Sequence, residues 1–351
     1  MRPFEGVIGH RGVIDLLTRE ITEPAQSYLF TGPSNVGKST IARRFSAALL
    51  CGEDEECFRR VISGVHPDLV LIEPEGSASI TVDQARRVVS QATLSPFESD
   101  RKVFLFEEGG MMNDEAANAL LKTLEEPARA AAFIIVTETE DDLPDTVASR
   151  CRTVVLGRVS EKDVADGLVE MGIERRRADE TARIAGGRPG LALALATEAK
   201  VADYRRFWLT IPMRLGEHPG DAFLLADEAI TSAEPLLAAL KERQQDEREA
   251  LGDGAPKTLK DRQARELKRA TDALYATGLE ILASFYRDVA AAQFGAPVRN
   301  TDVPVAALSS VTPRHAVAGA DRVLTAVGAL AANQRPKLAL ANLFADLAGH
   351  A

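Results

Sequence analysis

Short apolar runs alternate with amphipathic segments along the first 156 residues. Strands that alternate with helices form parallel sheets whose two faces are both covered. The pattern therefore predicts a five-stranded parallel α/β domain, with Asn113 capping one of its helices and Pro127 ending that helix. The predicted strands are 27–31 (SYLFT), 68–72 (DLVLI), 102–106 (KVFLF), 133–137 (FIIVT) and 153–156 (TVVL), and the clearest helices are 81–94 and 114–126.

The strand signal disappears after Gly157. Ser160 and Asp163 are spaced as in a helix cap, and they open a helical stretch that extends to a turn at 186–190 (GGRPG). A further helix is expected to restart at Leu191.

From about residue 207 to residue 351 the chain is predicted to form long helices. The segment 241–269 mixes both charge signs densely, which is typical of a solvated helical hairpin rather than of a binding patch. Breaks between helices are expected at 216–220, 252–256 and 297–304.

Composition is that of an ordinary globular protein, with 45% hydrophobic and 27% charged residues. No apolar run approaches the ~18 residues of a membrane span, and the start of the chain lacks the apolar core of a signal peptide. These features predict a cytoplasmic protein with no membrane partner.

The charge and the cysteine content bear on two questions, namely DNA binding and the oxidation state of the thiols. The chain has 42 Lys and Arg residues against 52 Asp and Glu residues. The net charge of −10 argues against this chain being the main DNA-binding component of an assembly. Three cysteines, Cys51, Cys57 and Cys151, cannot pair evenly, and a chain of 351 residues does not need disulfides. We expect reduced thiols.

Residues 32–39 (GPSNVGKS) fit the phosphate-loop pattern G-x-x-x-x-G-K-[ST] in full. The motif follows a predicted strand and opens a predicted helix, which favours a nucleotide site over a chance glycine-rich turn. Backbone N–H groups can surround the phosphates, Lys38 can neutralise them, and the Ser39 hydroxyl can bind Mg²⁺. The predicted nucleotide-binding residues are Gly32, Pro33, Ser34, Asn35, Val36, Gly37, Lys38, Ser39 and Thr40.

Hydrolysis needs an acidic pair at the end of a neighbouring strand, and the candidates are Glu107 and Glu108. Glu107 would bind Mg²⁺ together with Ser39, and Glu108 would polarise water. Glu107 stands where Asp is usual, however, and its extra methylene sits poorly with the tight octahedral geometry of Mg²⁺. Both residues could instead be solvated carboxylates, so the sequence favours nucleotide binding over efficient catalysis.

Several stretches share the pattern of one known family, namely 7–10 (VIGH), 27–39, 66–68 (HPD), 113–127 (NDEAANALLKTLEEP), 143–151 (LPDTVASRC) and 187–193 (GRPGLAL). Together they resemble the AAA+ clamp-loader subunits of bacterial DNA polymerase III, and the delta prime (δ′) family in particular. The resemblance is dense over residues 4–195 and loose beyond. It implies a RecA-like AAA+ domain (1–158), a small three-helix lid (159–206) and an all-α C-terminal collar for oligomerisation (207–351).

The resemblance also assigns roles to single residues. In clamp loaders the arginine of a Ser-Arg-Cys motif enters the ATP site of the neighbouring subunit, so Arg150 is implied to be a catalytic arginine finger in trans. Its alternative is a surface arginine beside a strand. Glu138 stands where catalytic subunits carry Asn or Thr, and Gly190 where they carry Arg. Both departures imply that the chain's own ATPase is weak or absent.

The implied protein is a stator subunit in a hetero-oligomeric ring with γ/τ and δ subunits. That ring places the sliding clamp on primed DNA, and ATP or ADP with Mg²⁺ is the implied ligand of this chain. Two alternatives stay open: an ATP-hydrolysing γ/τ-type motor and a scaffold that binds no nucleotide.

The family often carries a four-cysteine zinc module after the phosphate-loop helix, of which only Cys51 and Cys57 remain here. A structural zinc needs four nitrogen or sulfur ligands, so zinc is not expected, although His66 and an acidic residue could in principle complete a site. By the same resemblance His10 and Gln26 lie near the adenine of a bound nucleotide or have a packing role.

Overall fold

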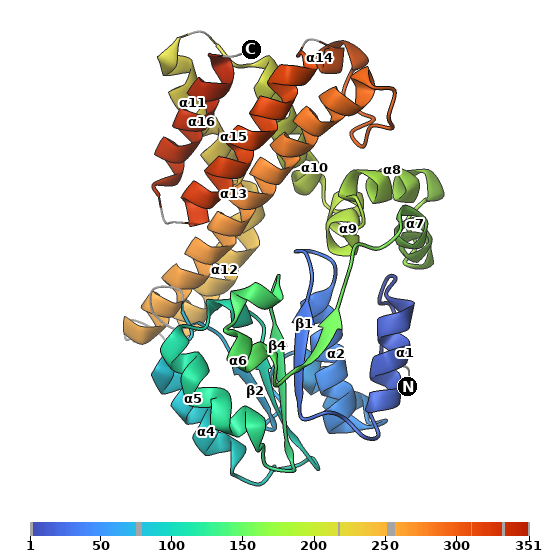
Figure 1. The fold of residues 1–351 in the computed structure, drawn as a ribbon, viewed down its shortest axis with the longest axis vertical. Coiled ribbons are helices and arrows are strands. Elements are labelled where there is room, and N and C mark those ends of the chain that lie inside the picture. Colours follow the sequence, from blue (N-terminus) through green and yellow to red (C-terminus); the bar gives the residue numbers. More distant parts are fainter. Residues whose placement is uncertain are drawn as a thin grey trace. The chain divides into compact units, whose positions relative to one another are not determined.

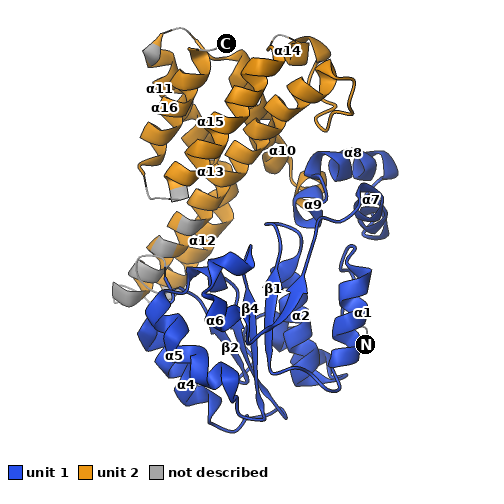
Figure 2. Ribbon diagram, in the orientation of Figure 1, with its two compact units in different colours: residues 1–193 blue, residues 194–351 orange. Residues whose placement is uncertain are grey.

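The computed structural model describes residues 3–74, 79–216, 218–250, 257–309, 311–331 and 334–349. The chain forms two compact units, unit 1 (residues 1–193) and unit 2 (residues 194–351) (Figure 2). The division at 158 and 206 into three domains stays a prediction.

Unit 1 is built around a five-stranded sheet in the order β2-β3-β4-β1-β5, in which every neighbouring pair is parallel (Figure 1). All five predicted strands are confirmed, with small shifts at their ends. The phosphate-loop strand β1 is flanked on both sides, because it pairs with β4 and β5. The strands are β1 (Ser27–Thr31), β2 (Leu69–Ile72), β3 (Lys102–Phe106), β4 (Ala131–Val136) and β5 (Arg152–Val155).

Helices cover both faces of this sheet, which explains why its strands are near-continuous apolar runs. Side chains alternate along β1, so that Tyr28 and Phe30 enter one core and Leu29 the other. The first core is closed by α1 (Arg11–Glu20), α2 (Lys38–Cys51) and α3 (Glu55–Ile62). The second is closed by α4 (Val82–Ala92), α5 (Asp114–Glu125) and α6 (Asp145–Ala148).

The predicted helix caps are present. The Asn113 side chain accepts a hydrogen bond from the N–H of Ala116 at 2.8 Å and opens α5. The Ser160 hydroxyl accepts one from the N–H of Asp163 at 3.0 Å and opens α7 (Glu161–Glu170).

The helical stretch predicted to continue up to residue 186 consists of two helices. A turn containing Gly172, at φ 90°, separates α7 from α8 (Arg175–Ala185). The next helix, α9 (Pro189–Thr197), starts two residues before the predicted Leu191. Ile8 packs with the buried residues of α7 and α8, so the N-terminal segment is tied to these helices.

Unit 2 is all-helical over its described residues, as predicted. Its core contains Trp208, Phe285 and Phe344, all fully buried, so the single tryptophan fills a helix interface. Gly278 lies against the Trp208 ring, where a Cβ atom would approach Cε2 to 2.1 Å. The helices are α10 (Ala199–Thr210), α11 (Pro219–Ser232), α12 (Glu234–Ala250), α13 (Lys257–Gln293), α14 (Val305–Ser309), α15 (Pro313–Ala331) and α16 (Pro336–Ala348).

The charged segment 241–269 lies on α12 and α13, as expected for a helical hairpin, and the predicted break at 252–256 lies outside the described residues. Two buried glutamines connect these helices. The Gln244 Nε2 donates to the carbonyl of Gln263, and the Gln263 Nε2 donates to the carbonyl of Gln244, both at 3.0 Å. In the part of the chain that the structure describes, no helix is both long and apolar enough to cross a membrane.

Candidate functional site

The phosphate loop joins the C-terminal end of β1 to the first residue of α2. Its first glycine is held between two neighbouring strand ends: the N–H of Gly32 donates to the carbonyl of Glu138, after β4, at 2.9 Å. A Cβ on Gly32 would lie 2.0 Å from the carbonyl oxygen of Leu156, after β5, and φ is 144°. Only glycine fits this position.

Two residues in left-handed conformations curl the rest of the loop. Asn35 has φ 61° and Gly37, which precedes α2, has φ 104°. No side chain caps α2, and no atom lies within 4 Å of a Cβ built on Gly37. α2 thus begins without a side-chain cap, and helix N-termini of this kind bind phosphate oxygens. Ser39 and Thr40 are exposed at this end.

Lys38 is folded onto its own loop. Its Nζ donates to the carbonyls of Gly32 at 2.6 Å and Pro33 at 2.8 Å. Burial lowers the pKa of Lys38, and the nearby carboxylates of Glu138 and Asp142 only partly offset this effect. The ammonium group is thus already inside the loop, where a phosphate would replace the carbonyls as its partner.

Glu107, the predicted metal ligand in the acidic pair after β3, is already bonded to an arginine. Both carboxylate oxygens of Glu107 accept hydrogen bonds from Arg43 on α2, with Arg43 Nη2 at 2.6 Å from Oε2 and Nε bonded to Oε1. This pairing raises the pKa of Arg43. Glu107 in this state does not fit the Mg²⁺ ligand predicted from the sequence, while Glu108 is exposed at the strand end.

The sequence interpretation missed Arg43. A signal was available, because Arg43 follows Ser39 by four residues and helical residues at that spacing share a face.

Glu138 and Gly190, the two departures from the pattern of catalytic subunits, also lie beside the loop. Glu138 is exposed, and its N–H donates to Asp142 Oδ2 at 2.9 Å. The N–H of Gly190, at the start of α9, donates to the carbonyl of Asn35 at 3.3 Å. Arg188 instead donates through Nε to the carbonyl of Ala185 at 3.0 Å. Gly190, which contacts the loop, thus has no side chain to offer a phosphate.

Arg150 lies in the turn between α6 and β5, with 30% of its side chain exposed. Its Nε donates to Glu125 Oε1 on α5 at 2.8 Å, its Nη2 also contacts that oxygen, and its Nη1 donates to the carbonyl of Thr146 at 2.7 Å. Arg150 is therefore a surface guanidinium with an intramolecular acidic partner. Nothing in the sequence pattern had singled out Glu125.

The neighbouring Arg152 has a different role. Its Nη1 lies 2.6 Å from Oε1 of the buried Glu20, whose other oxygen accepts a hydrogen bond from the Tyr28 hydroxyl at 2.6 Å. Burial, together with this bond, raises the pKa of Tyr28 well above its ordinary value. Arg152 thus fixes the start of β5, directly after the Ser-Arg-Cys motif.

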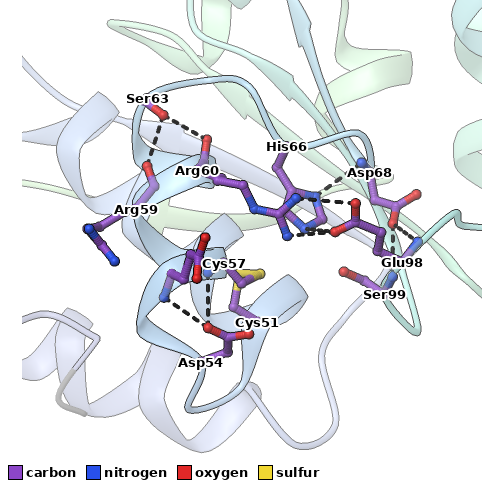
Figure 3. The surroundings of a disulfide bond; sticks show 11 residues. Cys51, Asp54, Cys57, Arg59, Arg60, Ser63, His66, Asp68, Glu98 and Ser99 are labelled. Carbon is purple, nitrogen blue, oxygen red and sulfur yellow. Dashed lines mark hydrogen bonds and ion pairs between the residues drawn. A yellow bond between two sulfur atoms is a disulfide. The ribbon is translucent and has the colours of Figure 1, made fainter.

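The expectation of three reduced thiols is wrong. Cys51, the last residue of α2, and Cys57, in the first turn of α3, form a disulfide with a Cα–Cα distance of 5.5 Å (Figure 3). Cys151 is the free cysteine, and burial raises its pKa to about 12. The pairing arises because the turn after α2 brings two cysteines six positions apart together.

The buried His66 lies beside this disulfide, and the Sγ atoms and an imidazole nitrogen are all within 4.8 Å of one another. Three donors fall short of the four that a structural zinc needs. The expected absence of zinc stays a prediction.

His10 and Gln26, expected near an adenine, lie at different ends of β1. His10 Nε2 is 2.8 Å from the carbonyl of Val36, so His10 does touch the loop. Gln26 precedes β1, and its Nε2 lies 3.4 Å from the carbonyl of Pro127. Gln26 is therefore at the wrong end of the strand, because the phosphate loop follows its other end.

A phosphate loop after an inner strand of a five-stranded parallel sheet, with a helical segment resting on that loop, defines unit 1 as a P-loop domain of the AAA+ class. Residues 9–160 match the family model described as "DNA polymerase III, delta subunit". The chain is also similar to δ′ subunits of DNA polymerase III, and the resemblance stated from the sequence is confirmed.

Three relatives illustrate the extent of the similarity. The δ′ subunit of Bacillus subtilis is 29% identical over 211 residues, which are 58% of this chain and 64% of that protein. The δ′ subunit of Pseudomonas aeruginosa is 37% identical over 137 residues, 36% of this chain and 42% of that protein. The τ/γ subunit of Haemophilus influenzae is 31% identical over 181 residues, 48% of this chain and 26% of that protein. The match spans less than two thirds of each relative's length.

Proposed function

We propose that this chain is a δ′-type subunit of a DNA polymerase III clamp loader and acts as a stator that supplies Arg150 to the ATP site of a neighbouring subunit. Its partners would be γ/τ and δ subunits, with the sliding clamp and primed DNA bound by the assembled complex. The relatives are subunits of a replicative polymerase, from which we infer a cytoplasmic site of action.

The observation that carries the proposal is the surface position of Arg150 within its Ser-Arg-Cys motif. Its acidic partner Glu125 is 47% exposed, and an exposed ion pair contributes little free energy, about 0–1 kcal/mol. The guanidinium can therefore leave Glu125 for a phosphoryl group at small cost. A planar guanidinium that reaches a transferring phosphoryl can accelerate the transfer by about 10³ to 10⁵.

The chain's own loop would hold ATP or ADP and turn it over slowly. The loop and Lys38 offer a phosphate cradle, whereas Glu107 is bound to Arg43 and Gly190 presents no side chain. These features support a stator over a γ/τ-type motor. A single-turnover ATPase rate above ~1 s⁻¹ for the isolated full chain, an ordinary enzyme rate, would support the motor instead.

The decisive experiment is reconstitution of the loader with γ/τ, δ and either the wild-type chain or its Arg150→Ala variant. We expect normal assembly with the variant, but the ATP site facing it should lose about 10³-fold in rate, and clamp loading should fall with it. Arg86→Ala is the matched control, because Arg86 is 71% exposed and pairs with Asp83 on its own helix. Unchanged ATPase and clamp loading with Arg150→Ala would remove the trans role.

A further inference from the structure

Arg43 and Ser39 are placed on the same face of α2, one turn apart. The Ser39 hydroxyl, which would bind the metal of a metal–phosphate complex, is thus followed one turn later by the guanidinium of Arg43. That guanidinium meets the end of β3, where the carboxylate of a metal site would stand, and holds both oxygens of Glu107. Its third group, Nη1, donates to the carbonyl of Ile62 at 3.2 Å.

The pair is partly shielded from water, with 31% of the Arg43 side chain and 19% of the Glu107 side chain exposed. Two-point guanidinium–carboxylate bonds are among the stronger polar contacts in proteins. For Mg²⁺ to bind Glu107, it would have to displace this guanidinium and leave it partly buried beside a divalent cation. Both changes cost free energy, because Arg43 would lose its partner and face a like charge.

A second carboxylate beside the loop is also engaged. Asp142 Oδ2 accepts the N–H groups of Glu138 and Thr139, and its Oδ1 accepts the Thr139 hydroxyl at 2.9 Å. The positive charge that faces a phosphate here comes instead from Lys38 and from the N-terminus of α2.

We propose that Arg43 is a specificity-determining residue that closes the metal position of this site, so that the loop binds a nucleoside diphosphate or triphosphate without needing Mg²⁺. The proposal rests on nucleotide binding at Lys38, which is part of the proposed function. It adds that the Glu107 carboxylate binds the Arg43 guanidinium and not a metal ion.

Titration of the isolated full chain with fluorescent ADP, in MgCl₂ and in EDTA, tests this inference. We expect the wild-type dissociation constant to differ by less than about twofold between the two conditions, and Lys38→Ala to abolish the signal. In Arg43→Ala, Mg²⁺ should tighten binding by about tenfold or more, since Glu107 is released. Replacing Glu107 as well, in Arg43→Ala/Glu107→Gln, should remove that gain.

Arg44→Ala is the matched control, because Arg44 is the next residue of α2 and donates to the carbonyl of Pro3 at 3.0 Å, not to Glu107. It should behave as the wild type. A wild type that requires Mg²⁺, one that binds no ADP, or an Arg43→Ala variant that gains no Mg²⁺ dependence would each overturn the proposal. A gain that persists in the double variant would do so too. None of these results depends on Arg150, whose role is read out only in the assembled loader.

Discussion

The disulfide between Cys51 and Cys57 should stabilise the folded protein, and the size of this effect follows from the loop that it closes. It connects the end of the phosphate-loop helix to the first turn of α3 and closes a loop with a sequence separation of six. Reducing it frees the unfolded chain, so the folded state should lose relative stability. We therefore expect reductant to destabilise unit 1.

The magnitude follows from loop-closure entropy. For a loop of about seven residues the cross-link removes about 8 cal/mol/K from the unfolded chain, or about 2 kcal/mol at 25 °C. For a unit of this size, 1 kcal/mol corresponds to about 2–4 °C in melting temperature, so reduction should lower the Tm of unit 1 by about 4–8 °C.

The assay is thermal unfolding of the full chain with and without reductant, together with a thiol count under denaturing conditions. The chain has three cysteines, so the protein should show one thiol before reduction and three after it. Reductant should not change the melting of Cys51→Ala/Cys57→Ala, whereas the control Cys151→Ala should keep the wild-type response. Three reactive thiols in the untreated protein, or a Tm that ignores reductant, would refute the reasoning.

Two further predictions concern one buried group in each unit. Burial opposes ionisation of Asp68, but the N–H groups of residues 97–99 outweigh it and hold the pKa of this carboxyl below its ordinary value. Its contribution to the free energy of unfolding is therefore present above about pH 4 and is lost as the pH falls through the lowered pKa. In denaturant titrations, the free energy of unfolding of Asp68→Asn should be lower than that of the wild type at pH 7 and should fall less between pH 7 and pH 3. An equal fall with pH in both proteins would contradict this. In unit 2, Gly278→Ala forces a methyl group against the buried Trp208 and should cost about 1–3 kcal/mol. Fluorescence-detected unfolding would measure the loss, with Gly328→Ala as a control because a Cβ there meets no atom within 4 Å.

The α/β part of the fold was predictable because its signals are local. Strands buried on both faces are near-continuous apolar runs, as β4 and the middle of β1 are. Asn113 caps its helix through a residue three positions away. The position of the break at Gly172 was not predicted, because one glycine within a helical stretch does not by itself end a helix.

The site was predictable only where one segment builds all of it. The phosphate loop is continuous in sequence, so its motif indicated its structure directly. Contacts between Arg43 and Glu107, or between Arg150 and Glu125, join residues 64 and 25 positions apart, and no local pattern specifies them. Gln26 shows a different error, because a residue that precedes β1 must lie at the opposite end of that strand from a loop that follows it, and the sequence already showed this order.

The reciprocal bonds between Gln244 and Gln263 have a mechanical consequence for the α12–α13 pair. A shift of one helix along the other would break both hydrogen bonds between these buried amides. Each buried amide left without its partner costs about 1–3 kcal/mol. Sliding is therefore disfavoured, while bending of the two helices together leaves both bonds intact. A displacement of α12 would therefore move α13 with it, without a change of register, so that the two helices move as one rigid element.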